Sequence, residues 1–249
     1  MPPIKTTFLG RKKEGKKIIE ITIIPVRNFP EINEGDDLIE MLFKSLESSK
    51  LSIEENDIIV ITQKIVSKSE SRLRNLEDIS FEELLSQEST EIIRKRGELV
   101  IARTKHGIIC ANAGIDKSNI KNGHALLLPI DPDKSASKFR KQIYKYTQKN
   151  VAVIISDTFG RPWRVGQVNF AIGSSGIQPL VSYIGKNDTY KNELNATEIA
   201  IIDEIASSAE LVMEKTLNIP IAILRGVNYK TSKGNAKDLV RKENEDFFI

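Results

Sequence analysis

Short runs of apolar, mostly β-branched residues recur along the chain, and they constrain its fold more than any other feature. Their length and their Ile and Val content are typical of strands, and several are apolar throughout, which predicts strands that are buried on both faces. The runs cover residues 18–24, 57–62, 98–102, 107–110, 125–130, 151–156 and 219–224.

Helical patterns fall between these runs. In the first of them, Leu38, Leu42 and Leu46 are spaced to share one face of a helix. Ser80 and Glu83 form a capping-box signature, which predicts a helix that continues to about Arg96 and ends at Gly97. The expected helices cover 36–48, 80–96, 133–148 and roughly 194–216, with a last amphipathic stretch at 235–248.

Because helices and strands are mixed rather than strictly alternating, we predict an α/β or α+β fold with mixed sheets and packed helices. We expect a basic leader at 1–19 and one domain over 20–249, built as two interlocked subdomains that meet near 131–150. The chain has neither a Walker loop nor a GxGxxG fingerprint, so a bound nucleotide would require a less common fold.

Composition excludes several classes of protein. The single cysteine, Cys110, excludes an intrachain disulfide, and its apolar surroundings predict a buried structural thiol. No stretch approaches the roughly 18 apolar residues of a membrane span, and the first residues lack the apolar region of a secretory signal, so we expect a cytoplasmic protein without a membrane partner. The net charge is +3, but aromatic residues are few and not interleaved with basic ones, which argues against nucleic acid as a partner.

Two acidic positions stand out because each follows an apolar run. Asp116 and Asn119 follow the run at 107–110, whereas Asp157 and Thr158 follow the run at 151–156. Carboxylate and hydroxyl oxygens at the ends of buried strands suit Mg²⁺, which prefers oxygen ligands. The competing interpretation is a turn or helix-cap role, which aspartate often has in such places.

Basic residues lie near these acids. Arg161 and Arg164 follow Asp157 closely, and arginine forks match the oxygens of carboxylates and phosphates. We hypothesise that both arginines bind a substrate carboxylate; a solvated surface turn is the alternative. Lys64, Lys68 and Arg72 would share one face if their segment is helical, either to neutralise phosphate or as an exposed basic face.

Taken together, the segments of this chain resemble the F420-0:γ-glutamyl ligase family. The resemblance covers nearly everything from about residue 20 onward, in the family's order, and SDTFGRPWR and NAGIDKSN are its most specific segments. The other matching segments are PVRNFP, EGDDL, TQKIVSKSE, LLLPIDPDKSA, DEIASSAELVM, PIAILRG and GNAKDLVRKENEDFF.

The resemblance implies a GTP-dependent acid–amino-acid ligase that forms a C–N bond. GTP would phosphorylate the terminal carboxylate of coenzyme F420-0, and the amine of L-glutamate would attack the acyl phosphate. A second glutamate can follow through a γ-linkage in the family. The resemblance also implies a homodimer and two divalent ions, Mg²⁺ or Mn²⁺. Whether K⁺ is a further cofactor is a question that the sequence leaves open.

The resemblance assigns roles to individual residues. Asp116 and Asp157 resemble the ligands of one divalent ion, and Thr158 resembles a ligand of a second. Residues that match nucleotide contacts are Asn28, Phe29, Pro30, Glu31, Gln63, Lys64, Lys68, Asn119, Met213, Glu214 and Lys215.

One departure from the family pattern concerns the second ion. After Met213 the family usually has glycine and then glutamine or glutamate, whereas this chain has Glu214 and Lys215. A protonated lysine cannot ligate Mg²⁺. Either Glu214 substitutes through a small shift or the second metal site is altered.

Two other functions remain open at this stage. One is a different metal-dependent carboxylate kinase or amide ligase on the same scaffold, with another acceptor. The other is a non-catalytic nucleotide-binding regulator, which need not turn over GTP.

Overall fold

The computed structural model describes residues 6–7, 20–118, 120 and 122–247. Most of the basic leader predicted at 1–19 and the predicted nucleotide contact Asn119 therefore lie outside the described residues. In the part of the chain that is described, no helix is both long and apolar enough to cross a membrane.

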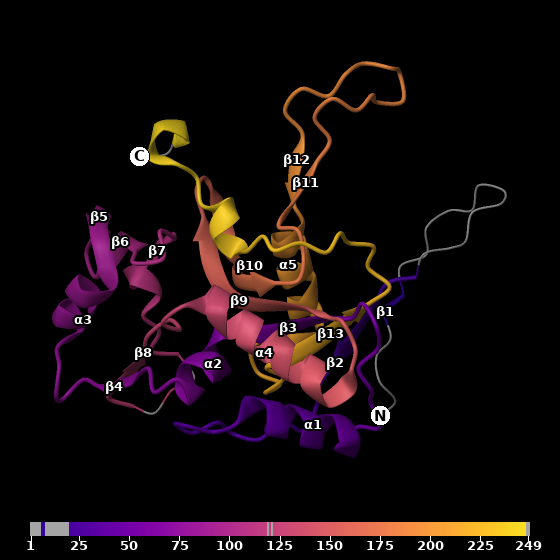
Figure 1. The fold of residues 1–249 in the computed structure, drawn as a ribbon. Coiled ribbons are helices and arrows are strands. Elements are labelled where there is room, and N and C mark those ends of the chain that lie inside the picture. The colour runs from indigo at the N-terminus through magenta and orange to yellow at the C-terminus, as the bar shows by residue number, and fades with distance from the viewer. Residues whose placement is uncertain (1–5, 8–19, 119, 121, 248–249) are drawn as a thin grey trace.

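A six-stranded mixed sheet forms the centre of the molecule (Figure 1). Neighbouring strands run antiparallel except β3 and β9, which are parallel. In order across the sheet, the strands are β1 (Thr6–Thr7), β2 (Thr22–Pro25), β13 (Ile221–Arg225), β3 (Ile58–Thr62), β9 (Ala152–Arg161) and β10 (Arg164–Ser175).

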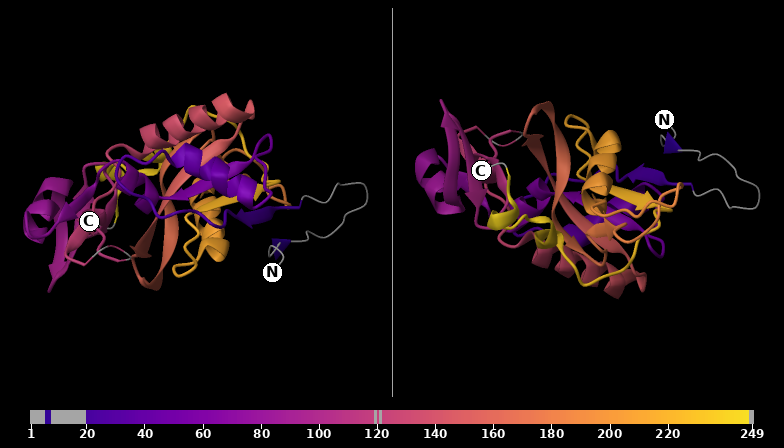
Figure 2. Two further views of the ribbon diagram at one scale, coloured as in Figure 1. Left: turned by 90° about the horizontal axis from the view of Figure 1, so that it is seen from below. Right: turned by 90° about the horizontal axis from the view of Figure 1, so that it is seen from above.

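Helices cover both faces of this sheet, which explains why its central strands are apolar throughout. One face packs against α1 (Leu38–Ser48), α2 (Gln63–Ser69) and α4 (Pro132–Thr147), and the other face packs against α5 (Ile201–Met213). The two views of Figure 2 place α4 and α5 on opposite sides of the strands. Successive side chains of β3 point to opposite faces of the sheet. Ile59 and Ile61 pack in the core beneath α1, α2 and α4, whereas Ile58 and Val60 pack in the core beneath α5.

Helix α1 begins where its sequence provides a cap. The Asp37 carboxylate accepts hydrogen bonds from the backbone N–H groups of Ile39 and Glu40, and the N–H groups at a helix start otherwise lack partners. Helix α4 is capped in the same way by Asp131, with Pro132 in its first turn. Both predicted helices, 36–48 and 133–148, are thus confirmed to within two residues.

Smaller elements extend from the central sheet. A lobe at one end of the molecule combines a helix with a three-stranded sheet, and a two-stranded hairpin projects away from the body (Figure 1). The lobe contains α3 (Phe81–Glu88), β5 (Ser89–Arg96), β6 (Leu99–Thr104), β7 (Ile109–Ala111) and the 3₁₀ turn η1 (Asn112–Gly114). Beside the lobe lies a two-stranded pair, β4 (Leu73–Asn75) and β8 (His124–Leu126). The projecting hairpin consists of β11 (Leu180–Ser182) and β12 (Glu198–Ala200).

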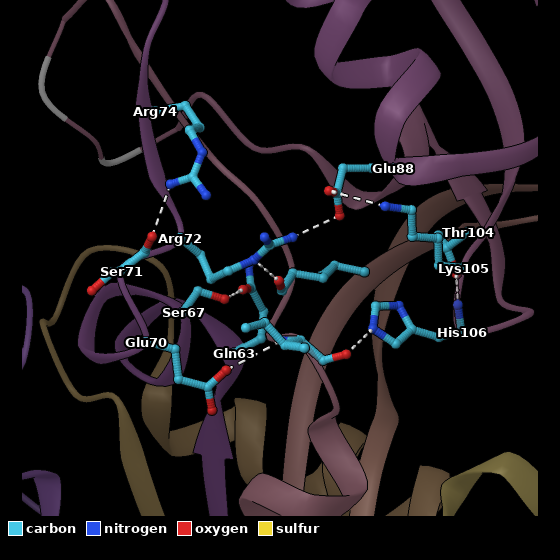
Figure 3. A network of polar contacts seen from close by, with 12 residues as sticks. Gln63, Ser67, Glu70, Ser71, Arg72, Arg74, Glu88, Thr104, Lys105 and His106 are labelled. Carbon is cyan, nitrogen blue, oxygen red and sulfur yellow. Dashed lines mark hydrogen bonds and ion pairs between the residues drawn. The ribbon is translucent and has the colours of Figure 1, made fainter.

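A network of polar contacts fastens the lobe to the central body (Figure 3). The Arg72 guanidinium donates to the Glu88 carboxylate at 2.7 Å and to the Leu128 carbonyl at 2.8 Å. The Arg72 and Glu88 side chains are only 13% and 11% exposed, so each charge depends on the other for compensation. Arg72 lies beyond the end of α2, and its role is structural; the predicted basic face is therefore reduced to Lys64 and Lys68.

Three sequence expectations about helices are corrected by the structure. The capping box of Ser80 and Glu83 is present, but α3 ends at Glu88, because the β-branched residues that follow form β5 and pair with β6. The helix expected at 194–216 is shorter, since residues 198–200 are strand β12. The stretch 235–248 forms two 3₁₀ turns, η2 (Ala236–Leu239) and η3 (Glu243–Glu245), within its described part.

Gly173 shows how closely α4 approaches β10. A Cβ atom at this position would lie 2.4 Å from the backbone of Pro132, so only glycine allows the contact. Asp133, beside it, accepts hydrogen bonds from the backbone N–H groups of Ser174 and Ala236. Residues 173–175 therefore belong to a strand that packs on the N-terminus of α4.

Candidate functional site

A cavity of about 550 Å³ opens where β3 ends beside β9. The two strands are parallel and paired as far as Thr62 opposite Ser156, so the residues that follow β3 lie beside the part of β9 that continues past this pairing. The chain after β3 supplies Gln63, Lys64 and Lys68, and β9 supplies Asp157. Ligand sites commonly form at the carboxyl ends of adjacent parallel strands.

Asp116 enters the cavity from the lobe. The turn before it has left-handed backbone at Asn112, Ala113 and Gly114, and a Cβ on Gly114 would lie 2.6 Å from Leu128, so this turn packs tightly against the body. Paired backbone hydrogen bonds of 2.9 Å between Asp116 and Leu126 then fix the position of the aspartate.

The Asp116 carboxylate accepts hydrogen bonds from Lys64 Nζ at 2.7 Å and from the backbone N–H of Ser118 at 2.6 Å. Burial opposes ionisation of this carboxyl, but the Lys64 and Ser118 hydrogen bonds outweigh burial and lower the pKa of Asp116. Asp116 is therefore an anion at neutral pH.

Asp157 behaves in the opposite way. Burial, together with the negative charge of Asp116, raises the pKa of its carboxyl to about 7, although the backbone N–H of Thr158, Lys64 and Lys215 act against this rise. Two carboxylates that penalise each other's charge in one cavity form an oxygen-rich position that a divalent cation would complete. Asp116 and Asp157 therefore offer two carboxylates to the divalent ion that the sequence resemblance implies, and Lys64 occupies one oxygen of Asp116, which leaves the Asp157 carboxylate and the other Asp116 oxygen for the ion.

No group of three or more His, Cys, Asp or Glu side chains able to hold a metal occurs within residues 20–118, 120 and 122–247. A two-carboxylate site of this kind suits Mg²⁺ best, since Mg²⁺ usually takes one or two protein carboxylates and fills its remaining positions with water and phosphate oxygens.

The second expected cation position has different surroundings. Thr158 Oγ1 donates to Asn169 Oδ1 at 2.7 Å, and Lys215 Nζ donates to Thr158 Oγ1 at 2.8 Å. The same ammonium lies 2.8 Å from the Glu210 carboxylate, which in turn accepts from Asn169 Nδ2 at 2.8 Å. The oxygen atoms of Thr158, Asn169 and Glu210 already surround the Lys215 ammonium. In this arrangement they do not fit a second cation.

Most of the expected nucleotide contacts gather around the same cavity. It is lined by Phe29, Pro30, Glu31, Gln63, Lys64, Lys68, Glu214 and Lys215. Lys68 forms an ion pair with Glu31 across the opening. Asn28 is exposed on the loop that precedes these residues, with φ of 58°, whereas the Met213 side chain is buried in the core beneath α5.

Gln63 presents an unmatched donor beside the cavity. Its side chain is 1% exposed, and its Oε1 accepts from Ser67 at 2.8 Å. Its Nε2 is buried, and no hydrogen-bond partner for it exists among the residues that the structure describes. A buried amide donor without a partner costs free energy, and a ligand oxygen in the cavity would satisfy it.

The cavity residues that sequence reasoning missed include the polar side chains of Ser118, Asn169 and Glu210. Ser118 was within a segment already singled out, and its hydroxyl bonds Lys64 at 2.9 Å. Asn169 is 2% exposed on β10, opposite Thr158, and a polar residue among apolar neighbours in QVNFAI was the available signal. Glu210 gave no signal, because it resembled the other acids on a solvated helix face.

A second cavity of about 300 Å³ lies on the far side of the β9–β10 hairpin and shares Phe159 and Gly160 with the first. Its walls are mostly apolar, and Arg161 is among the basic residues that line it. Arg161 donates to the Val165 carbonyl at 2.9 Å, whereas Arg164 is exposed near the tip of the hairpin. Burial raises the pKa of Asp203 in this cavity to about 6.

Comparison with known proteins identifies the family of the chain. The family model described as F420-0:Gamma-glutamyl ligase matches residues 27–226. A protein of Archaeoglobus fulgidus named coenzyme F420:L-glutamate ligase is 38% identical over 246 residues, which cover 92% of this chain and 96% of that protein. A protein of the same name in Methanothermobacter thermautotrophicus is 38% identical over 248 residues (92% and 98%).

A third relative of that name, from Methanocaldococcus jannaschii, is 40% identical over 232 residues, which cover 83% of this chain and 93% of that protein. The matches span both the lobe that supplies Asp116 and the strand that supplies Asp157. The chain belongs to the F420-0:γ-glutamyl ligase family.

Proposed function

We propose that this chain is a ligase that uses GTP to join L-glutamate to the terminal carboxylate of coenzyme F420-0. The observation that carries the proposal is the meeting of Asp116, Asp157 and Lys64 in one cavity, where the parallel pairing of β3 with β9 stops. Family membership supports the glutamate and the coenzyme as substrates, since the relatives are named for them.

The reaction must first activate a carboxylate, which is a poor electrophile without a good leaving group. In the proposed first step an oxygen of the acceptor carboxylate attacks the γ-phosphorus of GTP, and the bond between that phosphorus and the bridging oxygen breaks to release GDP. The glutamate amine then attacks the carbonyl carbon of the acyl phosphate, phosphate leaves, and the amine gives up a proton. The products are an amide, GDP and phosphate.

Both substrates of the first step are anions, so the site must offset their repulsion. Asp116 and Asp157 would hold one Mg²⁺ or Mn²⁺, which supplies charge stabilisation to phosphate oxygens. Lys64 already lies against Asp116, and Lys68 lies at the opening, so both ammonium groups are placed to meet phosphate. Phosphoryl transfer depends mainly on such positioning and electrostatic stabilisation.

The orphan amide of Gln63 supports a nucleotide in this cavity. Its Nε2 is buried beside the predicted phosphate-binding lysines and offers a hydrogen bond to a ligand oxygen. Gln63→Leu keeps a similar volume but removes the donor, so it should raise the KM for GTP by about tenfold, the value of one hydrogen bond to a charged oxygen. An unchanged KM would remove Gln63 from the nucleotide site.

The second cavity is our proposed place for the body of the coenzyme. It adjoins the first cavity at Phe159 and Gly160, and it combines apolar walls with basic residues, as a large organic anion requires. Arg161 lines it, so Arg161→Ala should raise the KM for the coenzyme by about tenfold through loss of a charge-assisted contact. Arg164→Ala tests our hypothesis that Arg164 binds a substrate carboxylate. Unchanged KM values for both coenzyme and glutamate in this variant would show that Arg164 does not have that role.

We further propose that the protein acts in the cytoplasm as a homodimer. Large apolar side chains on projecting hairpins support a second copy as partner, because Trp163, Val165 and Tyr190 are 85%, 97% and 85% exposed. Light scattering coupled to size exclusion should give twice the mass of the chain. Trp163→Ser combined with Val165→Ser should shift this mass toward that of one chain.

Mass spectrometry of the products tests the function directly. Incubation with F420-0, GTP, glutamate and Mg²⁺ should yield the coenzyme with one added glutamate, or with two if the γ-linked step follows. Omission of any one component should abolish both the product and phosphate release. Phosphate release without coenzyme would point to a different acceptor, and GTP binding without any turnover would point to a regulator; either result would overturn the proposal.

A further inference from the structure

The ammonium of Lys215 sits among oxygen atoms of the kind that normally surround a metal ion. Its Nζ lies 2.8 Å from Thr158 Oγ1, 2.8 Å from the Glu210 carboxylate and 3.4 Å from Asn169 Oδ1. A hydroxyl, a carboxylate and an amide carbonyl are hard oxygen ligands of the type that divalent cations select.

The structure holds these oxygens in place from three different elements. Thr158 on β9 and Asn169 on β10 are opposite each other in the sheet and joined by a hydrogen bond of 2.7 Å. Asn169 is 2% exposed and also donates to Glu210 on α5 at 2.8 Å. The oxygen cluster is therefore built and rigid, and Lys215 supplies its positive charge.

The end of α5 brings Lys215 to this cluster. Glu214 adopts a left-handed φ of 48° and ends the helix, so the chain reverses direction immediately before the lysine. The Lys215 stem then remains at the mouth of the cavity, 57% exposed, while its ammonium reaches the buried oxygens. A left-handed conformation at a residue other than glycine costs free energy, which the surrounding structure must offset.

The Lys215 ammonium also affects the carboxylate pair of Asp116 and Asp157. Lys215 acts on Asp157, which is adjacent to Thr158 in β9, by stabilising the negative form of its carboxyl. A positive charge therefore lies near Asp157, one of the two carboxylates proposed to hold the divalent ion.

We propose that Lys215 is a built-in cation, which takes the place of a second metal ion in this chain. The site then holds one divalent ion per chain, at Asp116 and Asp157, and the Lys215 ammonium supplies the second positive charge toward the phosphate oxygens. The role of Lys215 toward phosphate rests on the proposed function. The number of divalent ions that the chain binds can be measured without turnover. Glu214, exposed at the turn, does not restore a second metal site.

Equilibrium dialysis against Mn²⁺, with GDP on both sides of the membrane, tests this proposal. The wild type should bind one Mn²⁺ per chain. Lys215→Gln removes the ammonium and leaves the oxygens of Thr158, Asn169 and Glu210 open, so it should bind two. Lys44→Gln, which replaces an exposed lysine on α1, is the matched control and should bind one.

A wild-type count of two would overturn the proposal even if the Lys215 variant failed to fold. A folded Lys215→Gln variant that still bound one Mn²⁺ would also overturn it. The proposed function fails separately: a chain that binds one Mn²⁺ but makes no product from coenzyme, GTP and glutamate would keep the Lys215 assignment and refute the ligase.

Discussion

The Lys64 ammonium lies 2.7 Å from the Asp116 carboxylate and so joins the end of β3 to the lobe of the molecule. This ion pair assembles the candidate site from two segments that are distant in the sequence. It also means that Lys64 has two tasks, since it must hold Asp116 and meet a phosphate of the nucleotide.

Replacement of Lys64 should therefore impair catalysis more than folding. Lys64→Met keeps most of the side-chain volume but removes the charge, and kcat should fall by about 10²–10³-fold, the usual loss for one preorganised electrostatic group. Steady-state phosphate release measures this effect. Lys44→Met, at an exposed lysine paired with Glu40, should keep full activity, and equal losses in both variants would contradict the role of Lys64.

Binding of a divalent ion should depend on pH through Asp157. Burial and the Asp116 charge raise the pKa of Asp157 to about 7, so below that pH a metal ion must displace a proton and above it the carboxylate is ready. Mn²⁺ affinity should therefore rise as pH increases through about 7 and level off above it. Electron paramagnetic resonance titrations at several pH values measure this affinity.

The Asp157→Asn variant provides the control for that pH dependence. It should bind Mn²⁺ weakly and with little dependence on pH near 7, because its amide does not titrate. A wild-type affinity that was flat between pH 6 and pH 8 would contradict the assignment of Asp157 as a ligand.

The positions of the central strands in the sequence were largely predictable, because buried β-branched runs have few alternatives. The runs at 57–62, 151–156 and 219–224 became β3, β9 and β13, the centre of the main sheet. Strand β10 was missed since its sequence mixes glycine and polar residues with apolar ones; it is stabilised by pairing with β9 and by α4 and α5 rather than by its own propensity.

The candidate site was predictable only in part. Asp116 and Asp157 could be singled out because each follows an apolar run, yet no spacing rule places them in one cavity. Their meeting depends on how the lobe packs on the body, which involves Gly114 and the bridge to Leu126. The contact of Lys215 with Thr158 joins segments that only the completed fold brings together, so the sequence could show the departure at Lys215 but not its effect.

The attachment of the lobe should depend on the Arg72–Glu88 ion pair (Figure 3). Arg72→Leu leaves the Glu88 charge buried without its main partner, and the free energy of unfolding should fall by about 3–5 kcal/mol. Urea denaturation followed by circular dichroism measures this change. The double variant Arg72→Leu with Glu88→Leu should recover much of the loss, since no lone charge remains.

The control for the Arg72–Glu88 ion pair is a more exposed ion pair in the lobe. Glu91, 51% exposed, forms an ion pair with Arg103, and Glu91→Gln should cost less than about 1 kcal/mol. Similar losses for Arg72→Leu and Glu91→Gln would show that burial of the first pair is not what makes it important.

Cys110 should be chemically inert in the folded protein. Burial and the nearby Asp157 charge together raise the pKa of its thiol to about 12. Only the thiolate reacts with iodoacetamide, so at pH 8 alkylation should be undetectable in the native state and complete in denaturant. Mass spectrometry counts the label, and rapid labelling of the native protein would show that the thiol is accessible and ionised.

Crystals soaked with Mn²⁺ and GDP give the most direct test of the central claim, that Asp116 and Asp157 share one cation. An anomalous difference map should show a Mn²⁺ peak in contact with an oxygen of each carboxylate, with Lys215 still bonded to Thr158. A peak held by only one of the two aspartates, or a bound GDP whose phosphates lie away from both, would contradict the account.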